Sequence, residues 1–419
     1  MTQAESTIAP RREEVGGEAE APIRVLCVDY SIGFGGATKS MALLLRYTDG
    51  IEPVVITSQK ADVRALWYGD WPTYLFRRLV NYRTVGLVSE RLQQWKAPAL
   101  VRRAAAKAMA AFDAVVGAVN TLRIALLIKR LRIDVLHLSN GFMPAEALRA
   151  AKLAGIPSIA HLRGFYSRSS DPSPPGTPSL VIGDSEAVTQ SYLEGAASTT
   201  STLTMHEVVD TPRFDALEDL RSVTREAWQL REEHVAVGLF GRVIPWKGQR
   251  EFVLAMLDAM QKDPKLVAFI VGDSSDGSEQ YFTEVKRLVQ EAGRSDRFRF
   301  TGYVERVEPL YGAMDIVVHA SIEPEPCGMV VQEGMAARRP VIAADAGGPR
   351  ELIRDGVDGR LVEPGHIASL SAAIAELAAD PRMRHRMGES GYRRARALYD
   401  VPVAAARLGS VYRQLSGRD

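Results

Sequence analysis

The 419-residue sequence contains little of several features that mark particular classes of protein. Its two cysteines, Cys27 and Cys327, are too few and too far apart for a disulfide framework, which suits a reducing cytosol. The net charge of +1 argues against a chain built around nucleic acid, although opposite charges can cancel between domains. No uninterrupted apolar run has the length of a membrane span, because Lys107 and Asp113 interrupt the nearest approach at residues 104–119.

The first 21 residues also lack the apolar segment of a signal peptide. They are polar and acidic, so we expect a disordered tail at 1–21. The rest has the composition of a globular protein, with 46% hydrophobic and 25% charged residues in the whole chain. A chain of this length exceeds one ordinary core, and two domains are therefore expected.

In the first half, short apolar strands alternate with segments that are apolar at helical spacing. A strand at 23–28, a glycine-rich loop at 33–36 and a helix at 39–46 form the opening of a βαβ unit. Asp184-Ser185 is expected to cap a later helix. Further strands and helices are predicted at 54–57, 122–131, 133–138, 144–154, 157–161 and 180–182.

The second half repeats this alternation more regularly. Strands are predicted at 235–240, 266–271, 297–301, 316–319 and 340–343, with helices beginning near 248, 279, 309, 328 and 349. Strands that are apolar throughout and joined by helices indicate parallel, doubly wound sheets. The predicted fold class is therefore α/β, with two Rossmann-like domains, at 22–210 and 211–401, that face each other across a cleft. A last helix at 402–414 begins with a proline at a tolerated position.

The segment 241–248, Gly-Arg-Val-Ile-Pro-Trp-Lys-Gly, follows a predicted strand and opens a helix. Arg242 and Lys247 lie five residues apart beside the helix N-terminus, a combination that can bind a diphosphate. Arginine can hold two oxygens at once, whereas lysine acts as a mobile point charge. On this spacing alone, two surface cations on a loop are an equally good interpretation.

A second segment, 325–333, places Glu325 in a loop after a predicted strand and Glu333 inside the next helix. Between them, Gly328 allows the backbone to approach a ligand closely, and the helix start offers free N–H groups. Carboxylates can accept hydrogen bonds from pairs of sugar hydroxyls. Two solvated glutamates are the alternative, and paired glutamates alone are common.

Together the two segments resemble the retaining GT-B glycosyltransferases, especially glycosyltransferase family 4. The resemblance covers roughly residues 23–415 and rests on G-R-x4-K-G at 241–248 and E-x7-E at 325–333. Supporting matches are Phe-Thr-Gly-Tyr-Val at 300–304, Gly-Gly-Pro-Arg-Glu-Leu at 347–352, Val-Asp at 209–210 with Phe214, and Ile-Pro-Ser-Ile-Ala-His at 156–161.

The resemblance implies a role for each matching residue. Arg242 and Lys247 would neutralise the diphosphate leaving group, Glu333 would bind the ribose, and Glu325 would hold the transferred sugar. His161 would face that sugar from the opposite domain, and domain closure would complete the site. Further donor contacts are expected from Gly35, Gly36, Gly241, Gly302, Tyr303, Val304, Cys327, Gly328, Met329 and Val330.

The resemblance also implies that 22–210, with a returning C-terminal helix at 402–419, binds the acceptor, and that 211–401 binds the nucleotide sugar. Without the resemblance, a satisfied core histidine is the favoured interpretation of His161. Arg163 could add a charge near the acceptor, but a structural or exposed arginine is the more common case. Cys327 stands where a bulkier residue is usual in the family, which could reshape the sugar pocket.

The implied reaction moves a hexose from a UDP- or GDP-linked donor to an acceptor hydroxyl in polysaccharide, glycolipid or glycoconjugate synthesis. Retention of configuration follows from the resemblance alone. No Asp-x-Asp pair offers a metal site, and two cations with a helix dipole suffice for the departing diphosphate, so no metal is expected. A GT-B nucleotide-sugar epimerase or phosphorylase and a non-catalytic nucleotide-sugar-binding subunit remain alternatives.

Residues 64–107 interrupt the strand and helix pattern with seven aromatic residues and nine cations, against the acids Asp70 and Glu90. One interpretation is a platform for a membrane surface or lipid acceptor, since cations meet anionic head groups and aromatics favour the interface. The other is a helical excursion with core aromatics and a solvated basic face. We therefore expect a cytoplasmic protein, with peripheral contact at the inner face of the membrane under the first interpretation.

Overall fold

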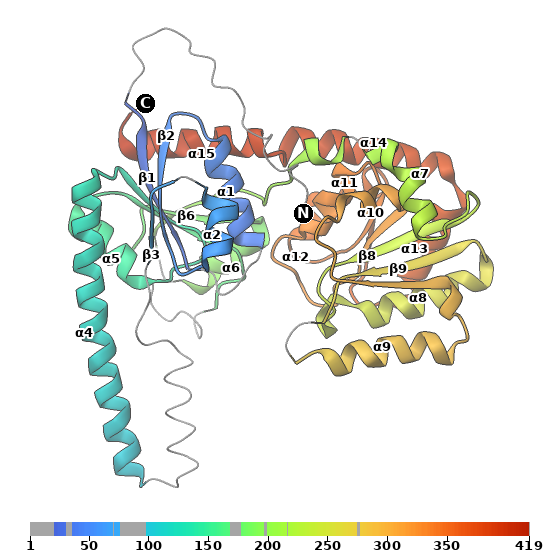
Figure 1. The fold of residues 1–419 in the computed structure, drawn as a ribbon, viewed down its shortest axis with the longest axis horizontal. Helices are drawn as coiled ribbons and strands as arrows, with labels where there is room; N and C mark the ends of the chain where they lie inside the picture. The colour runs from blue at the N-terminus through green and yellow to red at the C-terminus, as the bar shows by residue number, and fades with distance from the viewer. Residues whose placement is uncertain are drawn as a thin grey trace.

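The structure is a computed structural model that describes residues 21–30, 36–69, 71–75, 98–167, 177–196, 199–215, 217–274 and 277–418. The expectations for the N-terminal tail, for Gly35 and for residues 70 and 76–97 lie outside the described residues. Two parallel sheets lie side by side, each flanked by helices (Figure 1). The predicted fold class, two Rossmann-like α/β domains, is confirmed.

Within the described residues, the N-terminal domain contains a seven-stranded parallel sheet in the order β3-β2-β1-β4-β5-β6-β7. Strands β1, β2, β4, β5 and β6 run where apolar runs were predicted, because side chains on both faces are buried by helices, whereas β3 and β7 were not predicted. The elements are β1 (Ile23–Asp29), α1 (Gly36–Tyr47), β2 (Ile51–Thr57), α2 (Ala61–Tyr68), β3 (Thr73–Leu75), α4 (Ala99–Leu131), β4 (Val135–Leu138), α5 (Ala145–Ala154), β5 (Ser158–Leu162), β6 (Leu180–Gly183), α6 (Glu186–Gly195) and β7 (Ser201–Thr204).

The C-terminal domain contains a six-stranded parallel sheet, β10-β9-β8-β11-β12-β13, in the part of the chain that the structure describes. The 3-10 turn η1 (Thr211–Phe214) leads into it. The elements are α7 (Leu217–Ala227), β8 (Val235–Phe240), η2 (Pro245–Lys247), α8 (Gln249–Lys262), β9 (Leu266–Val271), α9 (Glu279–Glu291), η3 (Ser295–Arg297), β10 (Phe298–Gly302), α10 (Glu308–Ala313), β11 (Ile316–His319), α11 (Met329–Ala336), β12 (Val341–Ala344), α12 (Gly347–Leu352), β13 (Gly359–Val362), α13 (Ile367–Ala379) and α14 (Pro381–Leu398).

The chain returns to the N-terminal domain in its last helix, α15 (Val401–Ser416). This helix packs against α1, β1 and β4, and its Val401, Leu408 and Tyr412 are fully buried in the N-terminal core. Asp400 caps α15 and accepts hydrogen bonds from Thr211 at the start of η1. Figure 1 shows α14 and α15 running along one side of both domains, which ties the two together.

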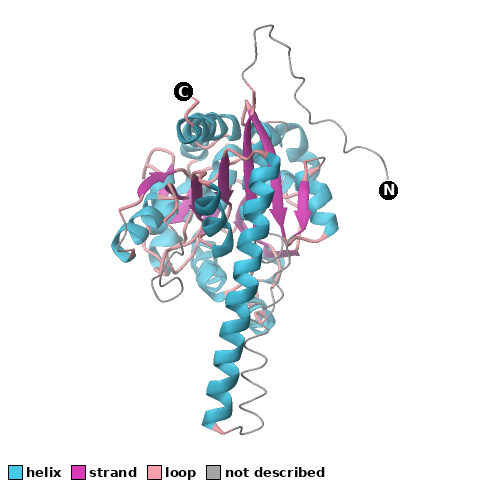
Figure 2. Cartoon of the chain, turned by 90° about the vertical axis from the view of Figure 1, so that its left-hand side faces the viewer, coloured by secondary structure: helices cyan, strands magenta, loops and turns pink. Residues whose placement is uncertain are grey.

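Helix α4 departs most from expectation, since a helix was predicted over residues 122–131 and the observed helix begins at Ala99. Its C-terminal part packs on α5 and buries Ile124 and Ile128 against the N-terminal domain. Its N-terminal part extends well beyond the sheets (Figure 2). Residues 104–121 are apolar on most sides, so the sequence lacks the two-faced pattern that identifies a helix packed on a core.

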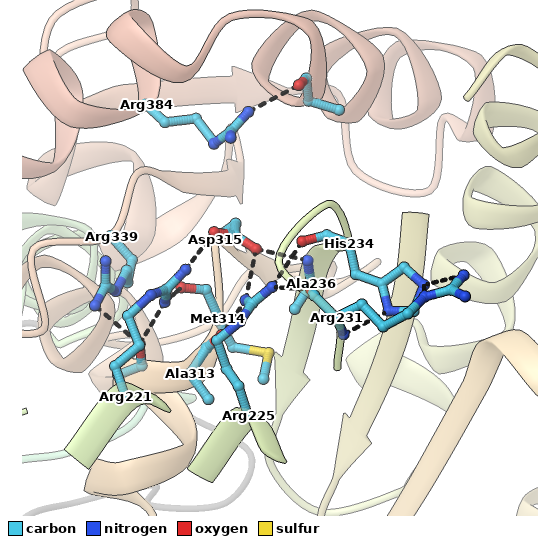
Figure 3. A network of polar contacts seen from close by, with 12 residues as sticks. Arg221, Arg225, Arg231, His234, Ala236, Ala313, Met314, Asp315, Arg339 and Arg384 are labelled. Carbon is cyan, nitrogen blue, oxygen red and sulfur yellow. Dashed lines mark hydrogen bonds and ion pairs between the residues drawn. The ribbon is translucent and has the colours of Figure 1, made fainter. Parts of the chain in front are cut away.

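At the amino ends of the C-terminal strands, Asp315 organises a network of arginines (Figure 3). Arg221 and Arg225 of α7 donate to its two carboxylate oxygens, at 2.6 and 3.0 Å, and Ala236 N donates at 2.8 Å. Arg225 also donates to the carbonyl oxygen of Ala313. This network fixes α7 to the sheet at the edge opposite to the strand ends that carry the motifs.

Candidate active site

The two sequence motifs meet where the strand order of the C-terminal sheet reverses, between β8 and β11. In open parallel sheets, ligands bind outside the carboxyl ends of the strands at this point. The loop after β8 carries Lys247 and the loop after β11 carries Glu325. Lys247 Nζ lies 2.5 Å from Glu325 Oε1, and the side chains are only 13% and 14% exposed. The structure therefore brings together two residues that lie 78 positions apart.

Gly248 explains how the first loop comes so close to the second strand. Its φ is +74°, and a Cβ atom there would collide with the carbonyl oxygen of Ala320, just after β11. Glycine is thus required both by the left-handed backbone and by the close approach. The side chain of Trp246, unusual in this motif, lies under the cation, with Lys247 Nζ 4.5 Å from its ring centroid.

Glu325 has further partners that its sequence position did not reveal. Its Oε2 lies 2.5 Å from His319 Nε2 and accepts a hydrogen bond from Ser321 Oγ at 3.0 Å. Burial alone would raise the pKa of Glu325, but the charges and hydrogen bonds of His319 and Lys247 hold that pKa below its usual range. The carboxylate is therefore fixed in its ionised form.

Arg242 is exposed, and within the described residues its guanidinium has no ion pair. Its carbonyl oxygen accepts a hydrogen bond from the buried Gln249 Nε2 at 2.9 Å, which fixes the backbone of the loop while the side chain stays free to turn. Gly241 directly follows β8, at the same sheet edge as Lys247. The motif thus offers one cation that is paired with a carboxylate, Lys247, and one that is not paired among the described residues, Arg242.

The start of α11 lies beside Glu325. Gly328, at φ +89°, caps the helix, and a Cβ atom on it would lie 2.8 Å from Pro349 Cγ of α12. The Gly348 N–H donates to the Glu325 carbonyl oxygen at 2.9 Å, so the segment 347–352 fixes the backbone of the loop that carries Glu325. Met329 and Val330 are partly exposed, whereas Cys327 is buried and burial raises the pKa of its thiol. Cys327 therefore fills space as an unreactive thiol.

Glu333 projects from α11 toward α10, where Tyr311 OH donates to its Oε2 at 2.8 Å. Tyr311 itself stacks on Phe240, with ring centroids 3.8 Å apart. Burial raises the pKa of Glu333, opposed by the charge of Lys39 and by the hydrogen bond from Tyr311. Lys39 belongs to α1 of the other domain, so the electrostatic environment of this carboxyl group is set by both domains.

Gly302, Tyr303 and Val304 follow β10 on the same edge of the sheet. The Gly272 N–H donates to the Gly302 carbonyl oxygen at 3.1 Å, and Gly272 in turn packs directly on the Gly241 carbonyl oxygen. The segment after β9 thereby contacts both the end of β10 and the segment after β8. Tyr303 is 72% exposed, so its ring is available to a ligand.

On the N-terminal side, His161 lies near the carboxyl end of β5 and is 2% exposed. Its ring stacks on His137, with centroids 5.5 Å apart, and among the described residues neither of its ring nitrogens has a hydrogen-bond partner. Burial, with the nearby charges of Arg163 and His137, lowers the pKa of His161 well below its usual value. The imidazole is neutral and unpaired.

Arg163 and Glu207 form a buried ion pair beside this histidine. Arg163 also donates to the Ser139 carbonyl oxygen at 2.8 Å, and Glu207 accepts from Ser40 of α1. Across the domain boundary, Gln332 Nε2 of α11 donates to the Glu207 carbonyl oxygen at 2.6 Å. The residue next to Glu333 is thus anchored to the N-terminal domain, at the segment between β7 and η1.

Gly36 of the N-terminal domain lies close to Met329 of the C-terminal domain. A Cβ atom on Gly36, at the start of α1, would lie 2.7 Å from Met329 Sδ. The start of α1 therefore faces the start of α11. Gly35 lies outside the described residues.

Several residues of this site were not predicted from the sequence. His319, Ser321 and Tyr311 carried no motif, although a histidine at the end of β11 next to Glu325 was an available signal. Arg163 was noted but considered structural. Its buried ion pair with Glu207 could not be foreseen, because Glu207 lies 44 residues further on, between β7 and η1.

Comparison with known proteins identifies the domain that carries most of these residues. Residues 221–394 match the family model described as "Glycosyl transferases group 1". These residues are therefore similar to a group 1 glycosyltransferase domain. The match includes both motifs, with Lys247, Glu325 and Glu333, and ends within α14.

Among curated relatives, the lipopolysaccharide core biosynthesis mannosyltransferase LpcC of Rhizobium leguminosarum bv. viciae is 34% identical over 181 residues, 43% of this chain and 51% of the relative. The GDP-mannose-dependent alpha-(1-6)-phosphatidylinositol monomannoside mannosyltransferase of Mycolicibacterium smegmatis is 30% identical over 218 residues, 50% of this chain and 55% of the relative. The chain spans about half the length of the curated relatives it matches.

Solved structures show the fold of the whole chain. A glycosyltransferase from Rickettsia africae has a TM-score of 0.77 at 20% identity and covers 96% of this chain and 100% of its own. Anabaena Alr3699/HepE in complex with UDP has a TM-score of 0.76 at 23% identity and covers 94% and 100%. These neighbours establish the GT-B arrangement of the two domains.

Proposed function

We propose that this protein transfers a hexose from a nucleoside-diphosphate sugar to an acceptor hydroxyl, without a metal and with retention of configuration, in the manner of glycosyltransferase family 4. The observation that carries the proposal is the buried pair of Lys247 and Glu325 at the strand-order reversal of a group 1 glycosyltransferase domain. A cation and a carboxylate placed there can bind, respectively, a diphosphate and sugar hydroxyls.

The diphosphate would lie beside Lys247 and Arg242, with the N-terminus of α11 adding backbone N–H groups of residues 327–330. Lys247 is held in place by Glu325, and Arg242 is free to turn toward the ligand. Charge that develops on the departing diphosphate is stabilised best by donors that are already in position. This arrangement supplies the stabilisation from residues of the chain alone.

The sugar would bind to Glu325, which His319 and Lys247 keep ionised. The ribose would bind to Glu333, whose Oε2 is already engaged by Tyr311. The base would lie near the exposed Tyr303, with the backbone of residues 302 and 304. Since the ends of β10, β9 and β8 are linked, base, ribose and diphosphate sites would follow one another along a single sheet edge.

The N-terminal domain, 22–210 with 402–419, would bind the acceptor, while 211–401 binds the donor. His161 is the candidate residue of the N-terminal domain for contact with the substrate, because neither of its buried ring nitrogens has a hydrogen-bond partner among the described residues. Buried polar groups normally have partners, and two unpaired ring nitrogens are ready to hydrogen-bond a substrate hydroxyl. Because the pKa of His161 is lowered, its imidazole would act as a neutral donor or acceptor.

The relatives narrow the donor and acceptor classes. Two are named mannosyltransferases, one of them GDP-mannose-dependent, and their named pathways concern lipopolysaccharide core and phosphatidylinositol mannosides. The neighbour HepE binds UDP. We therefore propose a UDP- or GDP-linked hexose as the donor and a polysaccharide, glycolipid or other glycoconjugate as the acceptor, for an enzyme that works in the cytoplasm.

A two-stage experiment tests this proposal. Thermal-shift measurements with a panel of nucleoside diphosphates and nucleotide sugars identify the donor, and product analysis with lipid-linked and free sugar acceptors then detects transfer in the presence of EDTA. Transfer that EDTA leaves unchanged supports the proposal. Conversion of the donor without any acceptor would point to an epimerase, stabilisation without turnover to a binding subunit, and inhibition by EDTA that Mn²⁺ reverses would contradict metal independence.

A further inference from the structure

Helix α4 presents an apolar stripe on its exposed side. Its five members follow one another at intervals of three and four residues and are between 50% and 67% exposed; they are Phe112, Val115, Val119, Leu122 and Leu126. Ile124 and Ile128, on the other side of the helix, are buried against the domain. Since residues three and four apart share a helix face, the stripe is continuous.

An apolar surface of this size marks a candidate interaction site. Five such side chains expose on the order of 500 Å² of apolar area, near the upper end of the roughly 300–600 Å² of the largest patch on a typical soluble monomer. The edge strand β3 adds Tyr74 and Leu75, 38% and 49% exposed. Between β3 and α4 lies a cavity of about 310 Å³, lined by Ile56, Tyr74, Leu75, Arg123, Ile124, Leu126, Leu127 and Arg130.

The charges that accompany the stripe are almost all positive. Helix α4 contains six cations and a single carboxylate, Asp113, whereas the net charge of the whole chain is only +1. Arg123, Lys129 and Arg130 are exposed beside Leu122 and Leu126. In the part of the chain that the structure describes, none of these three cations has an ion pair or a hydrogen bond.

We propose that this surface of α4 and β3, which we call the α4 face, docks on a membrane that contains anionic phospholipids. Apolar side chains flanked by unpaired cations fit the boundary between acyl chains and anionic head groups. By length and composition, Arg103–Leu131 is also the one helix among the described residues that could cross a membrane. The burial of Ile124 and Ile128 against α5 and the sheet favours docking instead.

A second copy of the chain is the other occupant that the spacing would suit, since intervals of three and four are those of a coiled-coil seam. Pairing of two α4 helices would bring Arg123, Lys129 and Arg130 of both copies to one interface. In a parallel pair, Asp113, the carboxylate of α4, could not neutralise them, because it lies roughly three to five turns away along the helix. Charge therefore favours the anionic lipid surface.

The docking goes beyond the proposed transferase activity and is measured without donor or acceptor, so the two can fail separately. Flotation of the full chain with vesicles of phosphatidylcholine alone, and of phosphatidylcholine with phosphatidylglycerol, measures the partition coefficient. We expect binding to the anionic vesicles. Since each cation near such a surface contributes about 1 kcal/mol, Arg123→Glu with Arg130→Glu should weaken binding more than about tenfold.

Two further variants complete the experiment. Leu122→Gln with Leu126→Gln should weaken binding to a similar degree through lost apolar burial. Arg382→Glu with Arg386→Glu, which makes the same charge change at exposed positions of α14, should leave it unchanged. Circular dichroism verifies that all variants are folded. Equal binding by all variants, or no binding by the wild type, overturns the proposal. The proposal is also overturned if the wild type forms a dimer in the absence of lipid and the double substitution Leu122→Gln with Leu126→Gln makes that protein monomeric.

Discussion

The ammonium group of Lys247 and the carboxylate of Glu325 lie 2.5 Å apart, joining the loop after β8 to the loop after β11. Each group thereby fixes the other beside the proposed binding site for the nucleotide sugar. His319 and Lys247 together hold the pKa of Glu325 below its usual range, against the opposing effect of burial. The pair is thus both a structural link and the centre of the proposed chemistry.

Lys247→Ala should lower kcat/KM for the nucleotide sugar by about 10²–10³, the usual effect of removing one positioned donor from a developing oxyanion. Lys262→Ala, which removes an exposed cation from α8 of the same domain, serves as the control and should leave kcat/KM unchanged. Steady-state kinetics with the identified donor measure both. A loss of less than threefold in Lys247→Ala would show that the cation does not contact the diphosphate.

His161→Ala should lower kcat by at least about 10² while leaving the Kd of the nucleoside diphosphate unchanged. The reason is that His161 belongs to the acceptor domain and its unpaired imidazole is proposed to contact the reacting sugar. Comparison of turnover with calorimetric titration separates the two effects. Equal weakening of diphosphate binding and turnover would assign His161 to the donor site instead.

Glu351→Ala should loosen the contact between the domains. Glu351 of α12 accepts hydrogen bonds from the N–H groups of Glu186 and Ala187, at 2.7 and 2.8 Å, and lies 2.9 Å from His206 Nε2. Loss of a cap at a helix N-terminus costs about 0.5–2 kcal/mol, so amides in the first turn of α6 should exchange faster with deuterium. Glu363→Ala, at an exposed position, should show no change; equal exchange in both variants would contradict the role of Glu351.

Asp184→Asn should change the dependence of stability on pH. Burial raises the pKa of Asp184 to about 7, with Arg163 opposing this, so between pH 4 and 7 the folded protein keeps a proton that the unfolded chain releases. Stability of the wild type therefore falls as pH rises through this range, by about 1.4 kcal/mol for each unit of pKa difference. In Asp184→Asn this decrease should be absent. Chemical denaturation at several pH values measures it, and an identical decrease in both proteins would refute the assignment.

Much of the fold could be predicted because its strands are apolar on both faces and its turns contain glycine. Strand β8 and strand β11 were placed to the residue, since each is a short apolar run with a clear end. The start of α4 could not be placed, because its alanine-rich first half has no face that packs on the domain. A helix without such a face leaves no periodic pattern in the sequence.

The motifs predicted which residues form the candidate site, but they did not predict the contacts between those residues. Arg242, Lys247, Glu325 and Glu333 were found through two motifs, yet the partners of Glu325 were not. His319 approaches Glu325 only because β11 ends there and the loop folds back, a geometry that spacing does not encode. The pairing of Arg163 with Glu207 depends likewise on the path of the segment between β7 and η1.

The most direct test of the central claim is a calorimetric titration of UDP, GDP and the matching nucleoside monophosphates into the wild type and Lys247→Ala. We predict that the wild type binds one diphosphate at least about tenfold more tightly than its monophosphate, a difference of about 1.4 kcal/mol. In Lys247→Ala this preference should largely disappear while monophosphate binding is kept. A wild type that binds neither diphosphate, or a preference that survives in Lys247→Ala, would contradict the account.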